Sequence, residues 1–311
     1  MQRSPFADPT PGLRIQEGAP AVTRPSKEQI AAYPQDAANL LERVWDDQKP
    51  RIDSGEYDLS WIDGKHLVLI GATGRGIGGA IAQKFAQEGY LAVLTTRTAA
   101  NAAALETAIG EQGGESMIVE LDLVSGQSIS NAFSKIRDEV GDPEVLVYNA
   151  GYLEGRDLPP DKELLEYIPD EMFETAQHIA SRGPFLVAKE VLPAMRERGE
   201  GSFLISNNQF SLRGRKRYTG QSLYYPRVMM RTLAQVLTEE YSEHGVHVAN
   251  VIIDGLIDSP GTRALPTAQE QPDIVMNPVK IAEAFYYLHN QDKSCWTHEI
   301  QLTAYPTKPS Y

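Results

Sequence analysis

The stretch HLVLIGATGRGIGGAIAQKFAQE, residues 66–88, decides the fold. Its first five residues form an apolar run that predicts a buried strand, and residues 78–88 place apolar side chains at helical spacing. Gly71, Gly76 and Gly78 lie between them and allow a tight turn and a close approach of another backbone. Backbone amides at the start of the helix then face outwards, where they favour an anion. A strand, a glycine-rich turn and a helix in this order predict a dinucleotide-binding site.

The alternation of apolar runs and amphipathic stretches continues to the end of the chain. Runs of this kind are typical of a parallel sheet that helices cover on both faces. We therefore expect one doubly wound α/β domain with a Rossmann fold over residues 65–311. Beyond the first strand and helix, we expect strands at residues 91–95, 117–121, 145–148, 202–205, 246–253 and 299–302. Helices are expected at 101–111, 127–140, 228–242 and 279–290, with a long helical region that ends near residue 198.

Residues 1–64 have a different composition from the rest of the chain. They hold seven of the 20 prolines and one convincing helical stretch, near residues 28–47. We interpret them as an N-terminal extension. Two alternatives stay open, an arm that wraps the core or a partner subunit, and a partly ordered tail with one docked helix.

The composition excludes several classes of protein. The 311 residues include 29 Lys plus Arg against 42 Asp plus Glu, a net charge of −13, which argues against nucleic acid or an anionic membrane as a partner. The single cysteine, Cys295, excludes an intramolecular disulfide. No run approaches the roughly 18 apolar residues of a membrane span, and the N-terminus lacks the apolar segment of a secretory signal. We expect a cytoplasmic protein.

Three further loops follow predicted strands and converge with the glycine turn. Asp122 and Leu123 follow the third strand, where the carboxylate can accept a hydrogen bond from an adenine amino group. Residues 148–151, Tyr-Asn-Ala-Gly, end the fourth strand, and residues 253–260, IDGLIDSP, end the sixth. The carboxyl ends of parallel strands meet in one crevice. The candidate cofactor contacts are Gly71, Thr73, Arg75, Gly76, Ile77, Gly78, Asp122, Leu123, Asn149, Ala150, Gly151, Gly255 and Ile257.

Together these features resemble the short-chain dehydrogenase/reductase family, whose usual signatures are a Thr-Gly-x-x-x-Gly-x-Gly turn, an Asn-Asn-Ala-Gly and a Pro-Gly loop. The resemblance covers about residues 64–303 and includes VLPAM at 191–195 and WTHE at 296–299. One departure is an extra residue in the glycine loop between Gly71 and Gly76. The resemblance implies an oxidoreductase with a nicotinamide cofactor and a small-molecule substrate. It also implies a homodimer or homotetramer, through the helices around residues 184–198 and 228–242.

Charge at the end of the second strand indicates which cofactor binds. A site that prefers NAD places an acid there to bind the ribose hydroxyls, whereas residues 95–98 are Thr-Thr-Arg-Thr. Arg97 can attract the 2′-phosphate of NADP, and Arg75 supplies a second cation whose forked donors suit phosphate. A solvated surface charge is the alternative for each arginine. Two of them at these positions predict NADP(H).

The resemblance implies four catalytic residues that this chain replaces. A usual member reduces a carbonyl with a Tyr as acid, a Lys four residues later, a Ser that polarises the substrate oxygen and a helix Asn. Matched by their neighbours, the Lys, Tyr, Ser and Asn positions fall on Arg227, Leu223, Asn208 and Ala180. Arg227 is then expected to contact the cofactor ribose as a fixed cation, because arginine does not act as a practical base. Asn208 takes the place of the serine.

A tyrosine can still serve as the proton donor. Matched to the family pattern, residues 215–227 hold about two extra residues, and Pro226 can turn Tyr224 or Tyr225 into the site. Tyr224 is the candidate donor, although no shift of the alignment places a lysine four residues after a tyrosine. Tyr152, Tyr225 and Arg215 are candidate substrate contacts, and Arg215 belongs to a basic run, residues 213–217, that can equally be a solvated loop or a subunit contact. The spacing of the six histidines predicts no metal site.

Three functions are compatible with this pattern. The first is an NADPH-dependent oxidoreductase acting on a C=O or C=N bond. An iminium acceptor needs no strong proton donor because it is already cationic, which fits the missing tyrosine. The second is a redox-neutral cyclase, isomerase or lyase. The third is a catalytically inactive NADP-binding sensor or subunit.

The arginines predict a preference between cofactors that calorimetry can measure. We expect NADPH to bind more tightly than NADH, because only NADPH carries the 2′-phosphate that Arg97 and Arg75 would meet. Comparable dissociation constants for the two would contradict the NADP assignment.

Overall fold

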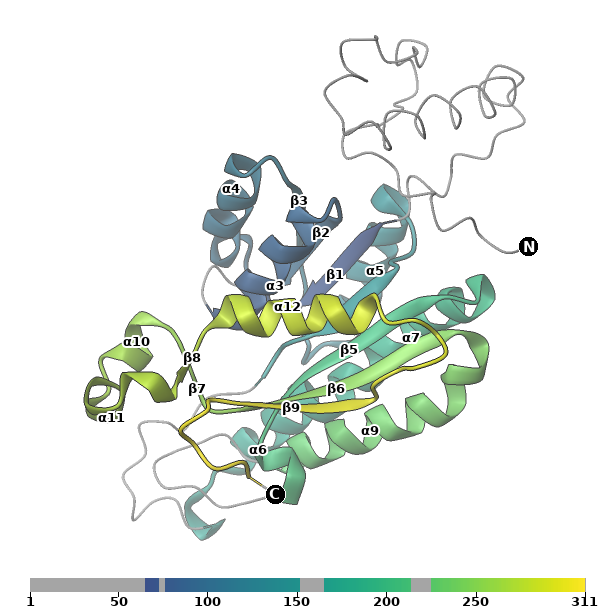
Figure 1. Ribbon diagram of the computed structural model, residues 1–311. Coiled ribbons are helices and arrows are strands. Elements are labelled where there is room, and N and C mark those ends of the chain that lie inside the picture. Colours follow the sequence, from purple (N-terminus) through teal and green to yellow (C-terminus); the bar gives the residue numbers. More distant parts are fainter. Residues whose placement is uncertain (1–64, 73–75, 152–164, 214–224, 311) are drawn as a thin grey trace, which may run out of the picture. The chain divides into compact units, whose positions relative to one another are not determined.

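The computed structural model describes residues 65–72, 76–151, 165–213 and 225–310, so the predicted extension over residues 1–64 lies outside the described residues. The strands form a seven-stranded sheet in the order β3-β2-β1-β4-β5-β6-β9, and each pair of neighbours is parallel (Figure 1). This is the doubly wound sheet predicted from the sequence. The strands are β1 (His66–Ile70), β2 (Leu91–Thr96), β3 (Glu115–Glu120), β4 (Val145–Tyr148), β5 (Gly201–Asn208), β6 (Val246–Asp254) and β9 (Glu299–Thr303).

Helices cover both faces of this sheet (Figure 1). One face packs against α3 (Gly76–Gln87), α4 (Ala103–Glu111) and α12 (Pro278–His289). The other packs against α5 (Gly126–Val140), α7 (Gly183–Arg198) and α9 (Tyr225–Tyr241). Short elements join them, namely η1 (Ala99–Asn101), η3 (Leu165–Tyr167), α6 (Asp170–Gln177), α8 (Phe210–Arg213) and η5 (Ser242–His244).

Alternating side chains of each strand create two cores, because successive residues of a strand point to opposite faces. Leu67 and Leu69 of β1 pack on the side of α3 and α12, with Phe285. Val68 and Ile70 pack on the side of α5 and α7. A strand buried on both faces has no polar side, which is why the sequence shows continuous apolar runs.

The long helical region before residue 198 is interrupted. A π-helical turn, η4 (His178–Arg182), joins α6 to α7. Such a turn shifts the backbone hydrogen bonds by one residue and is frequent at functional sites. Periodicity alone did not predict this interruption.

An excursion leaves the sheet between β6 and α12. It contains β7 (Leu256–Ile257), α10 (Pro260–Arg263), α11 (Pro266–Glu270), η6 (Pro272–Ile274) and β8 (Val275–Met276), and β7 pairs in parallel with β8. Its labelled helices α10 and α11 project beyond one end of the sheet (Figure 1). Within the described ranges, no helix combines the length and apolar character needed to cross a bilayer.

Helix α12 offers a matched pair of substitutions that test the packing on its face of the sheet. Phe285 is 0% exposed and Tyr287 is 64% exposed. We expect Phe285→Ala to lower the free energy of unfolding by about 3–5 kcal/mol, because it leaves a cavity in the core. Tyr287→Ala should change it by no more than about 0.5 kcal/mol. Urea denaturation of both variants measures the difference, and equal effects would contradict the packing of α12.

Candidate functional site

The loops after β1 and β4 lie against each other at the carboxyl edge of the sheet. Gly71 has a φ of +83°, and a Cβ on it would lie 2.9 Å from Ala150 Cα. A Cβ on Gly78 would lie 2.9 Å from Asn149 Nδ2, and that amide donates to Gly71 O at 3.4 Å. The structure therefore brings four predicted cofactor residues together, and both glycines are needed for steric reasons.

The start of α3 follows this contact. Gly76 begins the helix with a φ of +74°, and apart from the adjoining backbone no described atom lies within 4 Å of the position of a Cβ. Ile77 follows in the first turn, where amides lack partners within the helix. Anions bind favourably at such a helix start. Thr73 and Arg75, also predicted to contact the cofactor, lie outside the described residues.

The residues predicted to select and bind the adenosine half follow β2 and β3. Arg97 is exposed, and among the described residues no carboxylate forms an ion pair with it. Asp122 is exposed and accepts from Val124 N at 3.1 Å through Oδ1, while no described residue donates to its Oδ2. The side chain of Leu123 is buried in the core, so only its backbone is available to a ligand.

Arg227, at the predicted lysine position, is a buried cation. It lies in the first turn of α9, is 7% exposed, and donates from Nη1 to Ser206 O at 3.4 Å. Its Nη2 packs so closely on Gly151 that any Cβ there would overlap it. No described acid pairs with it, and burial lowers its pKa to about 10. The guanidinium therefore stays charged at neutral pH, beside the Asn149–Gly151 loop.

The carbonyl of Arg227 is held by a polar network. Asn207 Nδ2 donates to Arg227 O and to Asn250 Oδ1, each at 3.2 Å. Asn250 in turn donates to Glu299, which accepts two hydrogen bonds from Arg231. The backbone of the first turn of α9 is thus bonded to β5, and side-chain hydrogen bonds extend the network to β6 and β9.

Tyr148 is a residue of the site that the sequence argument missed. It stands where the family motif has its first asparagine, is fully buried, and donates from its hydroxyl to Ile179 O in the π-helical turn. Burial raises the pKa of this phenol, and the charge of Arg227 opposes that shift only in part. Tyr148 therefore stays neutral and bonded, and does not replace the missing catalytic tyrosine. The tyrosine in the Tyr-Asn-Ala-Gly motif was the available signal.

Two other positions of the family tetrad are occupied by different residues. Ala180 lies buried in the π-helical turn and offers no side-chain polar atom. Asn208 ends β5 and accepts from Phe210 N at 3.1 Å through Oδ1. No described residue accepts from its Nδ2, so this amide group can donate to a ligand oxygen or nitrogen.

The loop after β6 carries the remaining predicted cofactor residues. A Cβ on Gly255 would lie 2.7 Å from Met276 Sδ, so β7 and β8 approach closely there. Ile257 is half-buried against the core on the side of α12. Tyr152, Arg215 and Tyr224 lie outside the described residues, as does the side chain of Tyr225, and their predicted roles stay predictions.

These features define a dinucleotide-binding α/β protein, and comparison with known proteins gives its family. The family profile for short chain dehydrogenase matches residues 65–270. An uncharacterized oxidoreductase of Bacillus subtilis is 29% identical over 211 residues, covering 68% of this chain and 73% of that protein. The 3-oxoacyl-[acyl-carrier-protein] reductase of Escherichia coli is 28% identical over 245 residues, covering 76% and 94%.

A solved structure agrees with these matches. A metagenomic short-chain oxidoreductase in complex with NADP is 25% identical, with a TM-score of 0.63 over 77% of this chain and 96% of that one. The chain belongs to the short-chain dehydrogenase family and is an oxidoreductase of that family. The family predicted from the sequence is confirmed.

Arg227 and Arg231, one turn apart on α9, provide a test of the buried cation. We expect Arg227→Met to raise the free energy of unfolding by about 1 kcal/mol or more, because it removes a buried charge without a described acidic partner. The same change should weaken NADPH binding at least about tenfold. Arg231→Met removes the ion pair with Glu299 and should cost about 1 kcal/mol. It should change NADPH affinity much less than Arg227→Met does, because the direct hydrogen bond from Asn207 to Arg227 O remains. Denaturation and calorimetry measure both quantities, and unchanged NADPH binding in Arg227→Met would refute a cofactor role.

Proposed function

We propose that this protein is an NADPH-dependent oxidoreductase with a non-standard active site, which acts on a C=O or C=N bond of a small organic molecule. The observation that carries the proposal is a cofactor crevice with its glycine contacts intact beside a tetrad in which three described positions hold Arg227, Asn208 and Ala180. The cofactor contacts are present, but the family position of the proton-donating tyrosine holds another residue. This combination favours a hydride acceptor that needs no proton from the enzyme.

The choice of NADP(H) has two supports. Arg97 is exposed and unpaired among the described residues at the end of β2, where a 2′-phosphate would lie. The metagenomic relative with 25% identity was solved with NADP bound. Gly71, Gly78 and Asn149 would then receive the cofactor backbone, and Asp122 Oδ2 would accept from the adenine.

The side chains beside the nicotinamide end would bind and polarise. Bound NADPH supplies a hydride to the acceptor. Arg227 would donate hydrogen bonds to the ribose hydroxyls, and its charge would hold the sugar in place. Asn208 Nδ2 would donate to the acceptor atom of the substrate. Neither group releases a proton readily at neutral pH.

A C=N bond suits such a site better than a C=O bond. An iminium substrate arrives with its proton, so hydride transfer gives a neutral amine and no enzyme acid is required. A ketone would become an alkoxide that needs a proton, and Tyr224 is the candidate to supply it. The two acceptors therefore predict different roles for Tyr224.

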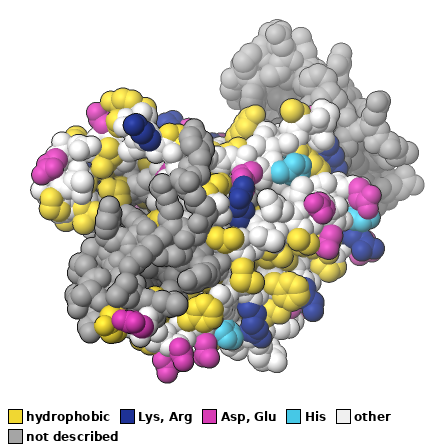
Figure 2. Space-filling view, turned by 90° about the horizontal axis from the view of Figure 1, so that it is seen from below, with side chains coloured by type: hydrophobic (Ala, Val, Ile, Leu, Met, Phe, Trp, Pro, Cys, Tyr) yellow, Lys and Arg dark blue, Asp and Glu magenta, His cyan; other side chains and the backbone are white. Residues whose placement is uncertain are grey.

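We also propose a homodimer or homotetramer formed through α7 and α9. Phe185 of α7 and Met229 of α9 are exposed apolar side chains, and both line a cavity of about 440 Å³ next to the π-helical turn. Figure 2 shows the face seen from below in Figure 1, where α9 lies, and hydrophobic side chains gather on it. Exposed apolar surface of this kind is typical of subunit contacts.

The test is a comparison of a cyclic imine with the ketone of matched ring size, each supplied with NADPH. We expect loss of absorbance at 340 nm with the imine and much slower loss with the ketone, because only the imine brings its own proton. The rate constant kcat/KM for the imine should fall as pH rises through the pKa of the substrate iminium.

Tyr224→Phe is the discriminating variant. It should leave imine reduction unchanged. The iminium assignment would be contradicted if the wild-type protein reduced the ketone faster than the imine. If Tyr224→Phe then abolished ketone reduction, Tyr224 would be the proton donor. Product formed without loss of NADPH would indicate a redox-neutral enzyme instead.

A further inference from the structure

The last described residues of the chain fold back over the end of β6. After β9 the chain turns at residues 304–307, where Thr307 N donates to Ala304 O at 2.9 Å. It then returns so that Ser310 reaches Asp254, the last residue of β6. We call residues 304–310 the C-terminal strap.

Asp254 binds the strap with both carboxylate oxygens. Ser310 N donates to Oδ2 at 2.6 Å, and Ser310 Oγ donates to Oδ1 at 3.1 Å. Gln301 Nε2 donates to the same Oδ2 at 2.8 Å and to Ser310 O at 3.3 Å. Asp254 is 7% exposed, and no described cation pairs with it. Hydrogen bonds from the strap and β9 therefore satisfy a buried charge.

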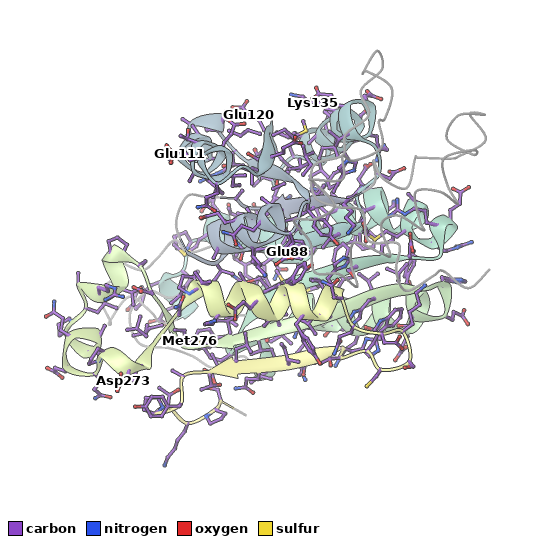
Figure 3. All side chains as sticks on the ribbon, turned by 45° about the horizontal axis from the view of Figure 1, so that its top comes forward. Glu88, Glu111, Glu120, Lys135, Asp273 and Met276 are labelled. Atoms are coloured by element: carbon purple, nitrogen blue, oxygen red, sulfur yellow. The ribbon has the colours of Figure 1, made fainter. Side chains whose placement is uncertain are left out.

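The strap has a second attachment on the excursion between β6 and α12. Tyr305, in the turn, donates from its hydroxyl to Asp273 Oδ2 at 3.0 Å. Asp273 lies in η6, three residues before Met276, whose sulfur packs on Gly255. Figure 3 labels Asp273 and Met276 on this excursion, near the C-terminal segment. The strap thus connects the end of β6 with η6, in the last part of the excursion before β8.

We propose that Asp254 and the C-terminal strap form a clasp that positions the loop after β6, and that Asp254 is a positioning residue for the nicotinamide half of the cofactor. The inference rests on the proposed function, in which Gly255 and Ile257 line the nicotinamide end. Asp254 immediately precedes Gly255, so the clasp fixes the backbone from which β7 begins.

The clasp acts on one half of the cofactor because of the strand order. The residues proposed for the adenosine half follow β1, β2 and β3, at one side of the sheet. Asp254 ends β6 and the strap follows β9, and these two strands lie at the other side of the sheet. A loosened clasp should therefore weaken contacts to nicotinamide and leave those to adenosine in place.

The test uses two variants that break the same contact from opposite sides. Asp254→Ala removes the acceptor, and Ser310→Pro removes both donors of Ser310, the backbone N–H and the hydroxyl, while Asp254 is kept. For each we expect faster hydrogen exchange of the amides at residues 255–276 and a dissociation constant for NADPH raised about tenfold. Adenosine 2′,5′-bisphosphate, which lacks the nicotinamide half, should bind with its affinity changed by less than about twofold.

Asp292→Ala is the matched control. Asp292, in the turn before β9, accepts from Ser294 N at 2.9 Å and from Ser294 Oγ at 2.5 Å. These are a serine amide and hydroxyl, the same two kinds of donor that Ser310 offers to Asp254. The control variant should alter neither exchange at residues 255–276 nor NADPH binding. The proposal is overturned if the two clasp variants behave like this control, or if they weaken both ligands equally, which would indicate a general loss of structure.

The two proposals fail in different ways. A wild-type protein that binds neither NADPH nor adenosine 2′,5′-bisphosphate would refute the proposed cofactor. The exchange of residues 255–276 would then still decide whether the clasp holds the loop, because that measurement needs no ligand.

Discussion

The close approach of the loops after β1 and β4 is the constraint on which the rest of the site depends. Gly71 can turn with a positive φ only because it lacks a Cβ, and the space a Cβ would fill belongs to Ala150. The same contact places Asn149 over Gly78 and brings Gly151 under the guanidinium of Arg227. Each of these pairs joins residues far apart in sequence, and each tolerates no larger side chain. The crevice is therefore defined by backbone shape before any charged group contributes.

Two buried side chains of opposite charge lie near this crevice. Arg227 faces the loop after β4 and Asp254 ends β6, and among the described residues neither has an ionic partner. Their surroundings differ, however. Asp254 receives hydrogen bonds from Gln301 and Ser310, whereas the guanidinium of Arg227 makes one long hydrogen bond, to Ser206 O, within the described part of the chain. The carboxylate of Asp254, whose hydrogen bonds are all made within the chain, stabilises the fold. The guanidinium of Arg227 has N–H donors left to bind a ligand.

The sequence predicted the sheet and the placement of the glycines well. Strands buried on both faces are continuous apolar runs, and Gly71 and Gly78 stand where a turn requires them, so both leave a local signal. The predicted fold class was confirmed. The bounds of β1 and β4 agree with the prediction, and the other main bounds differ by at most three residues, as where β5 extends to Asn208 rather than residue 205.

Contacts between distant residues were not predictable in this way. The π-helical turn follows from no periodic pattern, and the bond from Tyr148 to Ile179 O joins residues 31 apart. The burial of Arg227 is unusual for an arginine, and the clasp depends on Asp254 meeting a residue 56 positions later. The burial of the Leu123 side chain was not predicted either, because its motif predicted only a ligand contact, which stays a prediction for its backbone.

The pairing of β1 with both β2 and β4 has a consequence for how the molecule acquires its crevice. Gly71 meets Asn149, 78 residues further along, and β1 is hydrogen-bonded to β4 across the whole intervening chain. Closing so long a loop costs conformational entropy before the contacts between β1 and β4 stabilise the structure. Such long-range pairing slows the folding of parallel sheets. We therefore expect the contact between the loops after β1 and β4 to form late in folding, because contacts among β1, β2 and β3 alone cannot create it.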